Sequence, residues 1–359
     1  MNKTSRLLGT VGAAALAALG ASPALASGTA SGTTITNTVS VNYKVGGVDQ
    51  TATGASDSFK VDRKVNLTVA EVGTTTTEVS PGQTAAVTTF TVTNNSNATL
   101  DFALAAAQQT GGAGAHSNTD NFDATNVKIY VDTNGDGDYD VGTDLEVSYL
   151  DELGADLSKT VFVVVDIPLS LNSGDVAAVT LTATGREGGT GSSEGAALSQ
   201  TNTGAANEVD PNFVDTVFAD GTGATDGSRD GAHSAKDDFT VLAAALTVLK
   251  TSKVISDPLN GTSNPKAIPG ATIEYCISVA NAASSATASN VAISDPLPAT
   301  VTYDSGFGIL VDGTVTSGVC NADGSAGGSY NGGTTTVSGT LSAIPASDVK
   351  TLIFRATIN

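Results

Sequence analysis

A short acidic segment carries the residue types that bind a hard cation. Oxygen-bearing side chains alternate with other residues at Asp132, Asn134, Asp136 and Asp138. Such side chains converge when the chain wraps around an ion, and carboxylate and amide oxygens are the ligands that Ca²⁺ takes in proteins. Gly135 and Gly137 supply the backbone freedom that a tight turn needs. The segment therefore predicts a structural calcium site.

This segment resembles the first half of an EF-hand-type calcium loop. In that pattern a bidentate glutamate closes the ligand shell at the twelfth position, which is Thr143 in this chain. Asp140 or Asp144 would therefore have to close the shell. The alternative interpretation is an acidic, solvated turn between strands, because Asn-Gly and Asp-Gly pairs are common in turns.

A second acidic set follows later in the chain, in a stretch rich in Gly, Ser and Thr. Its members are Asp220, Asp226, Asp230, Asp237 and Asp238. Their spacing is irregular, which favours a solvated loop over a second cation site.

The chain contains two cysteines, Cys276 and Cys320. An even number of cysteines in an exported chain favours a disulfide between them. A catalytic thiol would instead need a nearby histidine, and His116 and His233 both lie in earlier, Gly-rich stretches. We therefore expect a disulfide.

Residues 191–195 match the G-x-S-x-G letters found around the nucleophile of many hydrolases, which would make Ser193 the nucleophile. That arrangement works only on a turn between a strand and a helix, and neither flank of this segment has periodic hydrophobicity. No zinc-protease, P-loop or dinucleotide-binding motif is present in the sequence. No catalytic residue is assigned.

Composition narrows the classes of function further. The chain has 359 residues, with 36 acidic and 16 basic residues and a formal net charge of −20. Phosphates would be repelled by so acidic a chain, which excludes a basic groove for nucleic acid or for an anionic membrane. The absence of Trp and the presence of only two His are unusual for an enzyme.

The N-terminus has the pattern of a secretory signal peptide. Lys3 and Arg6 precede an apolar stretch at 7–19, and Ala24-Leu25-Ala26 supplies the small residues of a cleavage site. Cleavage after Ala26 predicts a secreted protein, extracellular or on the cell surface. No later segment is long enough to span a membrane, and the apolar stretch at 241–249 is interpreted as a buried strand.

The remaining sequence indicates an all-β fold, with tandem immunoglobulin-like β-sandwiches preceded by an N-terminal β-hairpin. Residues 27–60 predict this hairpin and a possible exchange strand, because apolar and polar side chains alternate from Thr33 and a second strand returns after Gly46-Gly47. Seven short strands between 61 and 184 predict the first sandwich: 65–72, 85–94, 100–106, 127–131, 145–150, 161–167 and 176–184. A short helix at 100–109 is the weaker alternative for one of them.

Two segments complete the domain plan. Residues 185–238 predict a Gly- and Asp-rich linker or long loop. Residues 239–359 predict the second sandwich, with strands near 242–250, 272–281, 288–294, 301–304, 335–341 and 350–358.

The second sandwich resembles the bacterial surface repeat domain known as DUF11. The motifs lie in the order of that family at Leu246–Lys250, Ile268–Tyr275, Ser278–Asn281, Asn290–Pro298 and Val301–Tyr303. Cys276 and residues 278–280 depart from the Thr-rich strand of the family. Residues 65–184 resemble the same class more loosely, at 79–82, 90–94 and 130–132. The resemblance implies an immunoglobulin-like, extracellular, structural or adhesive module without known catalytic residues.

Three hypotheses follow from the sequence. The first is a non-enzymatic structural protein of the bacterial cell surface or extracellular matrix that self-associates, or joins other surface proteins, through strand addition and is stabilised by calcium. The second is a monomeric adhesin or spacer. The third, a secreted hydrolase, depends on the letters around Ser193 alone.

Overall fold

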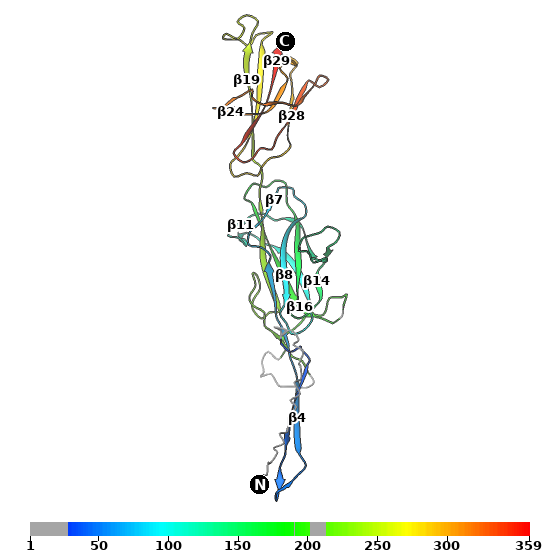
Figure 1. Cartoon of the computed structure of the whole chain (residues 1–359). Helices are drawn as coiled ribbons and strands as arrows, with labels where there is room; N and C mark the ends of the chain where they lie inside the picture. The colour runs from blue at the N-terminus through cyan, green and yellow to red at the C-terminus, as the bar shows by residue number, and fades with distance from the viewer. Residues whose placement is uncertain (1–27, 190, 202–212) are drawn as a thin grey trace, which may run out of the picture.

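The chain is a series of β-structures along one elongated molecule (Figure 1). The computed structural model describes residues 28–189, 191–201 and 213–359, and its only regular elements in these ranges are strands. A hairpin, a first sandwich and a second sandwich follow one another from the N-terminus to the C-terminus. This arrangement confirms the predicted fold. The predicted signal peptide, residues 1–26, lies outside the described residues.

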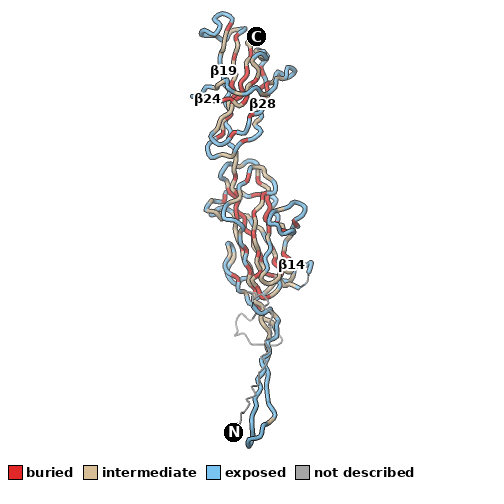
Figure 2. Tube along the Cα trace, in the orientation of Figure 1, coloured by how far each residue is buried: buried red, intermediate tan, exposed pale blue. Residues whose placement is uncertain are grey.

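The N-terminal hairpin projects from the first sandwich. Strands β1 (Thr34–Val41) and β4 (Thr53–Lys60) pair antiparallel from Thr34 opposite Lys60 to Val41 opposite Thr53. The tip contains β2 (Lys44–Val45) and β3 (Val48–Asp49), joined by two glycines with positive φ. At the base, the Asn97 side chain donates hydrogen bonds to the carbonyl oxygens of Thr29 and Asp62. The hairpin is thus attached at its base and exposed along its length (Figure 2).

The first sandwich has two five-stranded sheets. One sheet has the order β13 (Leu145–Glu146), β12 (Thr125–Val131), β15 (Ser158–Asp166), β8 (Ala86–Asn94) and β6 (Leu67–Glu71). The other has the order β14 (Tyr149–Leu153), β9 (Leu100–Gln108), β16 (Val176–Glu187), β18 (Ala232–Val241) and β7 (Thr77–Val79). Two short pairs lie outside them: β5 (Arg63–Val65) with β17 (Thr216–Phe218), and β10 (Gly112–Ala113) with β11 (Thr119–Asp120).

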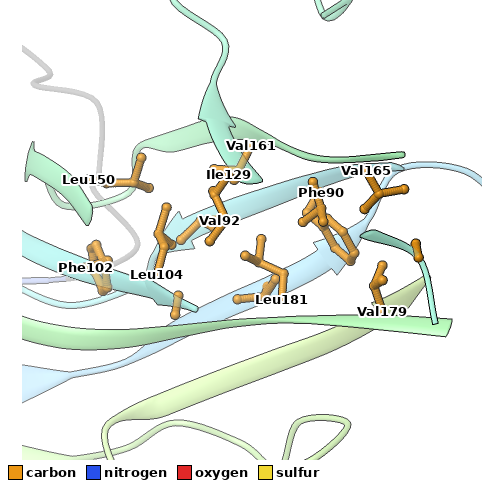
Figure 3. Packing of buried hydrophobic residues seen from close by; sticks show 14 of the residues in the cluster. Phe90, Val92, Phe102, Leu104, Ile129, Leu150, Val161, Val165, Val179 and Leu181 are labelled. Carbon is orange, nitrogen blue, oxygen red and sulfur yellow. The ribbon is translucent and has the colours of Figure 1, made fainter. Parts of the chain in front are cut away.

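Alternation in the sequence explains how these strands fill the core. In β8, the residues from Ala86 to Asn94 alternate between buried and half-buried, because successive side chains of a strand point to opposite faces. Phe90, Phe102 and Phe239 come from three strands and are fully buried. Figure 3 shows Phe90 and Val92 of one sheet near Leu104 and Leu181 of the other. The strand prediction for 100–106 holds, and the helix alternative is wrong.

Two boundaries in this sandwich differ from the prediction. Strand β18 pairs with β16 from Ala232 to Thr240 and its last residues pair with β7, so the segment at 185–238 is not simply a linker and the first sandwich extends to Val241. The predicted strand at 145–150 divides, because the chain passes there from β13 in one sheet to β14 in the other. Both differences arise from pairing between strands distant in sequence, which local composition does not report.

The second sandwich packs a larger sheet on a smaller one. The larger sheet has the order β19 (Leu246–Ser256), β20 (Thr272–Asn281), β29 (Val349–Ile358), β23 (Ile309–Gly313) and β26 (Ser325–Ala326), and β22 (Val301–Tyr303) also pairs with β29. The smaller has β21 (Val291–Pro296), β28 (Thr336–Leu341) and β27 (Ser329–Asn331). Ile277, Leu352 and Phe354 belong to a core separate from that of the first sandwich.

A disulfide links Cys276 to Cys320. Cys276 lies on β20, on the opposite face from the core residues Ile277 and Val279. Cys320 ends the ribbon formed by β24 (Val315–Thr316) and β25 (Val319–Cys320). The bond therefore attaches this ribbon to the outer face of the larger sheet.

The apolar stretch at 241–249 is not the buried strand that its composition predicts. Strand β18 ends at the buried Val241, and β19 begins at Leu246 with its first eight residues exposed. β19 lies at the edge of its sheet. The prediction failed because apolar composition does not show whether a strand lies at the edge or in the middle of a sheet.

Candidate functional site

Two aspartates fold the predicted calcium loop. Asp132 follows β12, is buried, and accepts hydrogen bonds from the backbone N–H groups of Gly135 (2.6 Å) and Gly137 (3.0 Å). Asp144 is also buried and accepts the N–H groups of Thr133 (2.9 Å) and Asp140 (2.7 Å). These bonds close the loop at both of its ends.

The other predicted ligands lie on the exposed side of the loop. The Asn134 side chain donates to the carboxylates of Asp136 (2.9 Å) and Asp140 (3.1 Å), which brings these three side chains together. Asp138 donates its backbone N–H to Asp136. Each carboxylate oxygen offers more than one lone pair, so the oxygens that already accept an N–H can also bind a cation. The donor set fits Ca²⁺.

Tyr139 fixes this loop to the sandwich. Its ring lies 4.9 Å from the ring of Tyr130 and 5.9 Å from that of Phe162, measured between centroids. Burial raises the pKa of Tyr139 to about 12, assisted by a hydrogen bond with Tyr130 and by the negative charges of Asp144 and Glu146. The loop thereby covers the outer face of β15, where Phe162 is fully buried.

The second acidic set is only partly the solvated loop that its spacing predicts. Asp220 is buried and accepts the N–H groups of Asp230 and Gly231. Asp237 and Asp238 are buried on β18. For these three residues the prediction is wrong, because backbone N–H groups and strand pairing hold them inside.

The segment around Ser193 is a loop without the geometry of a hydrolase nucleophile. The backbone N–H of Ser192 donates to Asp151, and that of Gly195 donates to Asp101. The required turn runs from a strand into a helix, and the part of the chain that the structure describes contains no helix. The letters therefore match without the structure that would make Ser193 reactive.

The hairpin has two chemically different faces. Residues opposite each other in an antiparallel pair share a face, and the register places Ile35 opposite Phe59 and Val39 opposite Ala55. Together with Val41 these residues form what we call the apolar face, which the polar pair Asn37 and Asp57 interrupts on the same side. Val39 is 57% exposed and Val41 49% exposed. The other face carries hydroxyl side chains at Thr34, Thr36, Thr38, Ser40, Ser56 and Ser58.

At the opposite end of the molecule, β19 presents a free strand edge. Among the described strands it pairs with β20 alone. Leu246 and Val248 lie opposite Asn281 and Val279, on the core side of the sheet, yet they are 42% and 63% exposed. Sequence reasoning anticipated an exchange strand but missed β19, whose apolar residues looked like core.

Comparisons with known proteins give a limited result. No family model and no curated protein matches the chain, so the resemblance to DUF11 stays a prediction. Among solved structures, the chain is similar to the CupB6 tip adhesin from Pseudomonas aeruginosa, with 13% identity, a TM-score of 0.25 and coverage of 83% of this chain and 91% of that one.

Two further solved structures are similar over the same share of this chain. The collagen adhesin (CNA) from S. aureus has 13% identity, a TM-score of 0.21 and coverage of 83% of this chain and 84% of that one. The RrgB pilus protein from Streptococcus pneumoniae has 12% identity, a TM-score of 0.22 and coverage of 83% of this chain and 45% of that one. At these values the similarity does not extend to function.

Within the described ranges, no helix has the length and hydropathy of a membrane span.

Proposed function

We propose that the chain is an exported, non-enzymatic structural subunit of a cell surface or extracellular matrix, and that copies join head to tail through the N-terminal hairpin. The observation that carries this proposal is the apolar face of the hairpin, which projects from the first sandwich and is largely exposed. The disulfide supports export, because disulfides persist in oxidising compartments.

An isolated two-stranded hairpin is at best marginally stable in water. Burial of an Ile, Val or Phe side chain contributes roughly 1.5–3 kcal/mol, and the apolar face exposes several such side chains. A partner that covers this face would therefore order the hairpin and gain affinity from the same contacts.

The partner is the β19 edge of a second copy. β19 has 11 residues against eight in each long hairpin strand, so its free edge can pair along a whole hairpin strand. In the joined sheet, its uncovered Leu246 and Val248 would lie beside the residues of the apolar face. Hairpin and β19 belong to opposite ends of the molecule (Figure 1), and contacts between two different surfaces extend into an open filament unless the rotation closes a ring.

We propose that bound calcium favours this assembly. The net charge of −20 opposes close approach of copies. Ca²⁺ held by Asp132, Asn134, Asp136, Asp138 and either Asp140 or Asp144 would neutralise charge and make the loop rigid. Extracellular modules bind calcium at about 10⁻⁴–10⁻³ M, which sets the concentration to use.

Two neighbouring hairpin residues provide the test. In the chain that begins at residue 27, Val39→Asp places a charge on the apolar face, while Thr38→Asp places the same charge on the hydroxyl face. With millimolar calcium we expect filaments or large oligomers for the parent and for Thr38→Asp, and monomers for Val39→Asp. Light scattering measures the size of the particles, and negative-stain microscopy shows whether they are filaments. Monomers of the parent under all conditions would favour a monomeric adhesin or spacer.

A mixing experiment tests the head-to-tail geometry. Val248→Asp damages the proposed acceptor, as Val39→Asp damages the donor, so each variant alone should remain monomeric. A mixture should form dimers and nothing longer, because each variant retains one intact surface. If Val248→Asp still forms filaments alone, β19 is not the acceptor.

A further inference from the structure

A histidine and two carboxylates meet at one edge of the first sandwich. His116 Nε2 lies 3.1 Å from Glu71 Oε1 and 3.4 Å from Asp237 Oδ1. The three ligand atoms all lie within 4.8 Å of one another. Their side chains are 15%, 18% and 5% exposed for His116, Glu71 and Asp237 respectively. The cluster is distant in sequence from the calcium-type loop and includes none of its residues.

Both carboxylates occupy positions that otherwise face the core. On β6, Glu71 has the same parity as the buried Leu67 and Val69. On β18, Asp237 has the same parity as the buried Phe239 and Val241. Since alternate residues of a strand share a face, the two acidic side chains enter the space between the sheets. His116 reaches them from the loop that connects β10 and β11.

The cluster has more acceptors than donors. A proton on Nε2 can be directed at one oxygen only, and the hydrogen-bond geometry favours Asp237. Asp237 also accepts the backbone N–H of Asp238 at 2.7 Å. Glu71 Oε1 is buried and accepts no hydrogen bond within the described part of the chain. A buried acceptor without a donor, beside a second carboxylate, is costly unless a cation is close.

The two carboxylates also repel each other electrostatically. Burial raises the pKa of Asp237 to about 6, and the negative charge of Glu71 acts in the same direction, against the hydrogen bonds from Asp238 and His116.

We propose that Glu71, His116 and Asp237 bind a transition-metal ion, with Zn²⁺ as the ion of choice. Zinc binds imidazole nitrogen and carboxylate oxygen at about 2.0–2.2 Å, usually as a tetrahedron. Ligand atoms of such a tetrahedron lie about 3.3 Å apart by geometry, close to the 3.1 and 3.4 Å found here. Ca²⁺ prefers six to eight oxygen ligands, so this site and the acidic loop select different ions.

The bound ion would have a structural role. It would join β6 of one sheet, β18 of the other and the loop at 114–118. Hydrogen bonds from this loop to Asp238 already hold it on β18, so the ion would mainly add a link from the loop to β6.

The test uses the chain from residue 27, stripped of metal with a chelator and then dialysed against ZnCl₂ with millimolar calcium present. Equilibrium dialysis with elemental analysis measures zinc bound per chain, and thermal unfolding measures stabilisation. We expect one zinc per chain and a raised unfolding temperature for the first sandwich. His116→Gln should weaken zinc binding by more than about tenfold, the loss that removal of even an outer-shell partner causes.

Glu71→Gln distinguishes a metal site from an ion pair between Glu71 and His116 that only stabilises the fold. It should stabilise the metal-free protein, because it removes one of two adjacent negative charges, and should abolish the response to zinc. Glu78→Gln on β7 is the matched control, since that side chain is exposed, and it should bind zinc as the parent does. Failure of the parent to bind zinc would overturn the proposal, and so would zinc binding as tight as that of the parent in both His116→Gln and Glu71→Gln.

Discussion

Several buried carboxylates in this molecule accept backbone N–H groups, most of them from loops. Asp120 accepts the N–H of Ala178 and that of Gly111, both at 2.7 Å. Asp132 and Asp144 do the same for the acidic loop. Hydrogen bonds to an ionised acceptor are stronger than those between neutral groups. Part of the acidic excess is therefore used to fix loops.

Asp257 offers the clearest test at the residue scale. It is buried and accepts the N–H groups of Leu259, Asn260 and Lys266, and the Asn260 side chain. Hydrogen bonds from the Asn260 backbone and side chain and from the Lys266 and Leu259 backbones lower the pKa of Asp257 from 3.8 to about 2. Because the folded pKa lies below the unfolded value, its stabilising contribution is present above pH 3.8 and is lost as the pH falls through about 2.

We predict that Asp257→Asn lowers the unfolding temperature at neutral pH and loses less stability than the parent between pH 4 and 2. Thermal unfolding across this range measures both effects. Asp123→Asn, at an exposed position, serves as the control. Parallel curves for the parent and Asp257→Asn would contradict the assignment.

At the scale of elements, the loop at 132–144 combines a cation-type donor set with an aromatic anchor. Tyr139 holds it on the sandwich through Tyr130 and Phe162, while Asp136 and Asp138 remain exposed. Calcium binding should therefore stabilise the whole sandwich to which the loop is fixed.

We predict that millimolar calcium raises the unfolding temperature of the parent and that the double substitution Asp136→Asn with Asp138→Asn removes most of this increase. Asparagine retains an acceptor oxygen but loses the charge that attracts the ion. Calorimetry with calcium and with chelator provides the measurement, and Asp123→Asn should behave as the parent does. An equal calcium response in the double variant would exclude these ligands.

Elements that depend on local sequence patterns could be predicted, and elements that depend on distant pairing could not. The hairpin and β8 were predictable because alternation and a Gly-Gly turn are local properties. The acidic loop was predictable because its residues are contiguous. β18 was not, since its Asp237 and Asp238 suggest a solvated segment until β16 pairs with it. In the sequence of β6, the charged Glu71 follows the same alternation as the apolar Leu67 and Val69. This pattern could have indicated the cluster around His116.

At the scale of the whole molecule, the two sandwiches have separate hydrophobic cores. Four residues, 242–245, connect β18 to β19. Domains with their own cores can unfold as separate units. The acidic loop at 132–144 belongs to the first sandwich, and the disulfide belongs to the second.

We predict two calorimetric transitions that respond to different treatments. Calcium should raise only the transition of the first sandwich. The cysteines of the Cys276–Cys320 disulfide are 44 positions apart. Reduction of this disulfide should lower the unfolding temperature of the second sandwich only, because its free energy of unfolding falls by about 3–4 kcal/mol in the chain-entropy model. A single transition that shifts with both treatments would show that the sandwiches unfold together.

The short β18–β19 connection also sets how the molecule would respond to tension. A pull along the long axis passes from β19 into β18 through four residues. β18 is bonded to β16 from Ala232 to Thr240, and β19 to β20 from Leu246 to Ser256. Hydrogen bonds of antiparallel strands run perpendicular to the strands, so this force loads them together in shear. Tension between the sandwiches would therefore be resisted by two strand pairs loaded in shear, with only four residues between them.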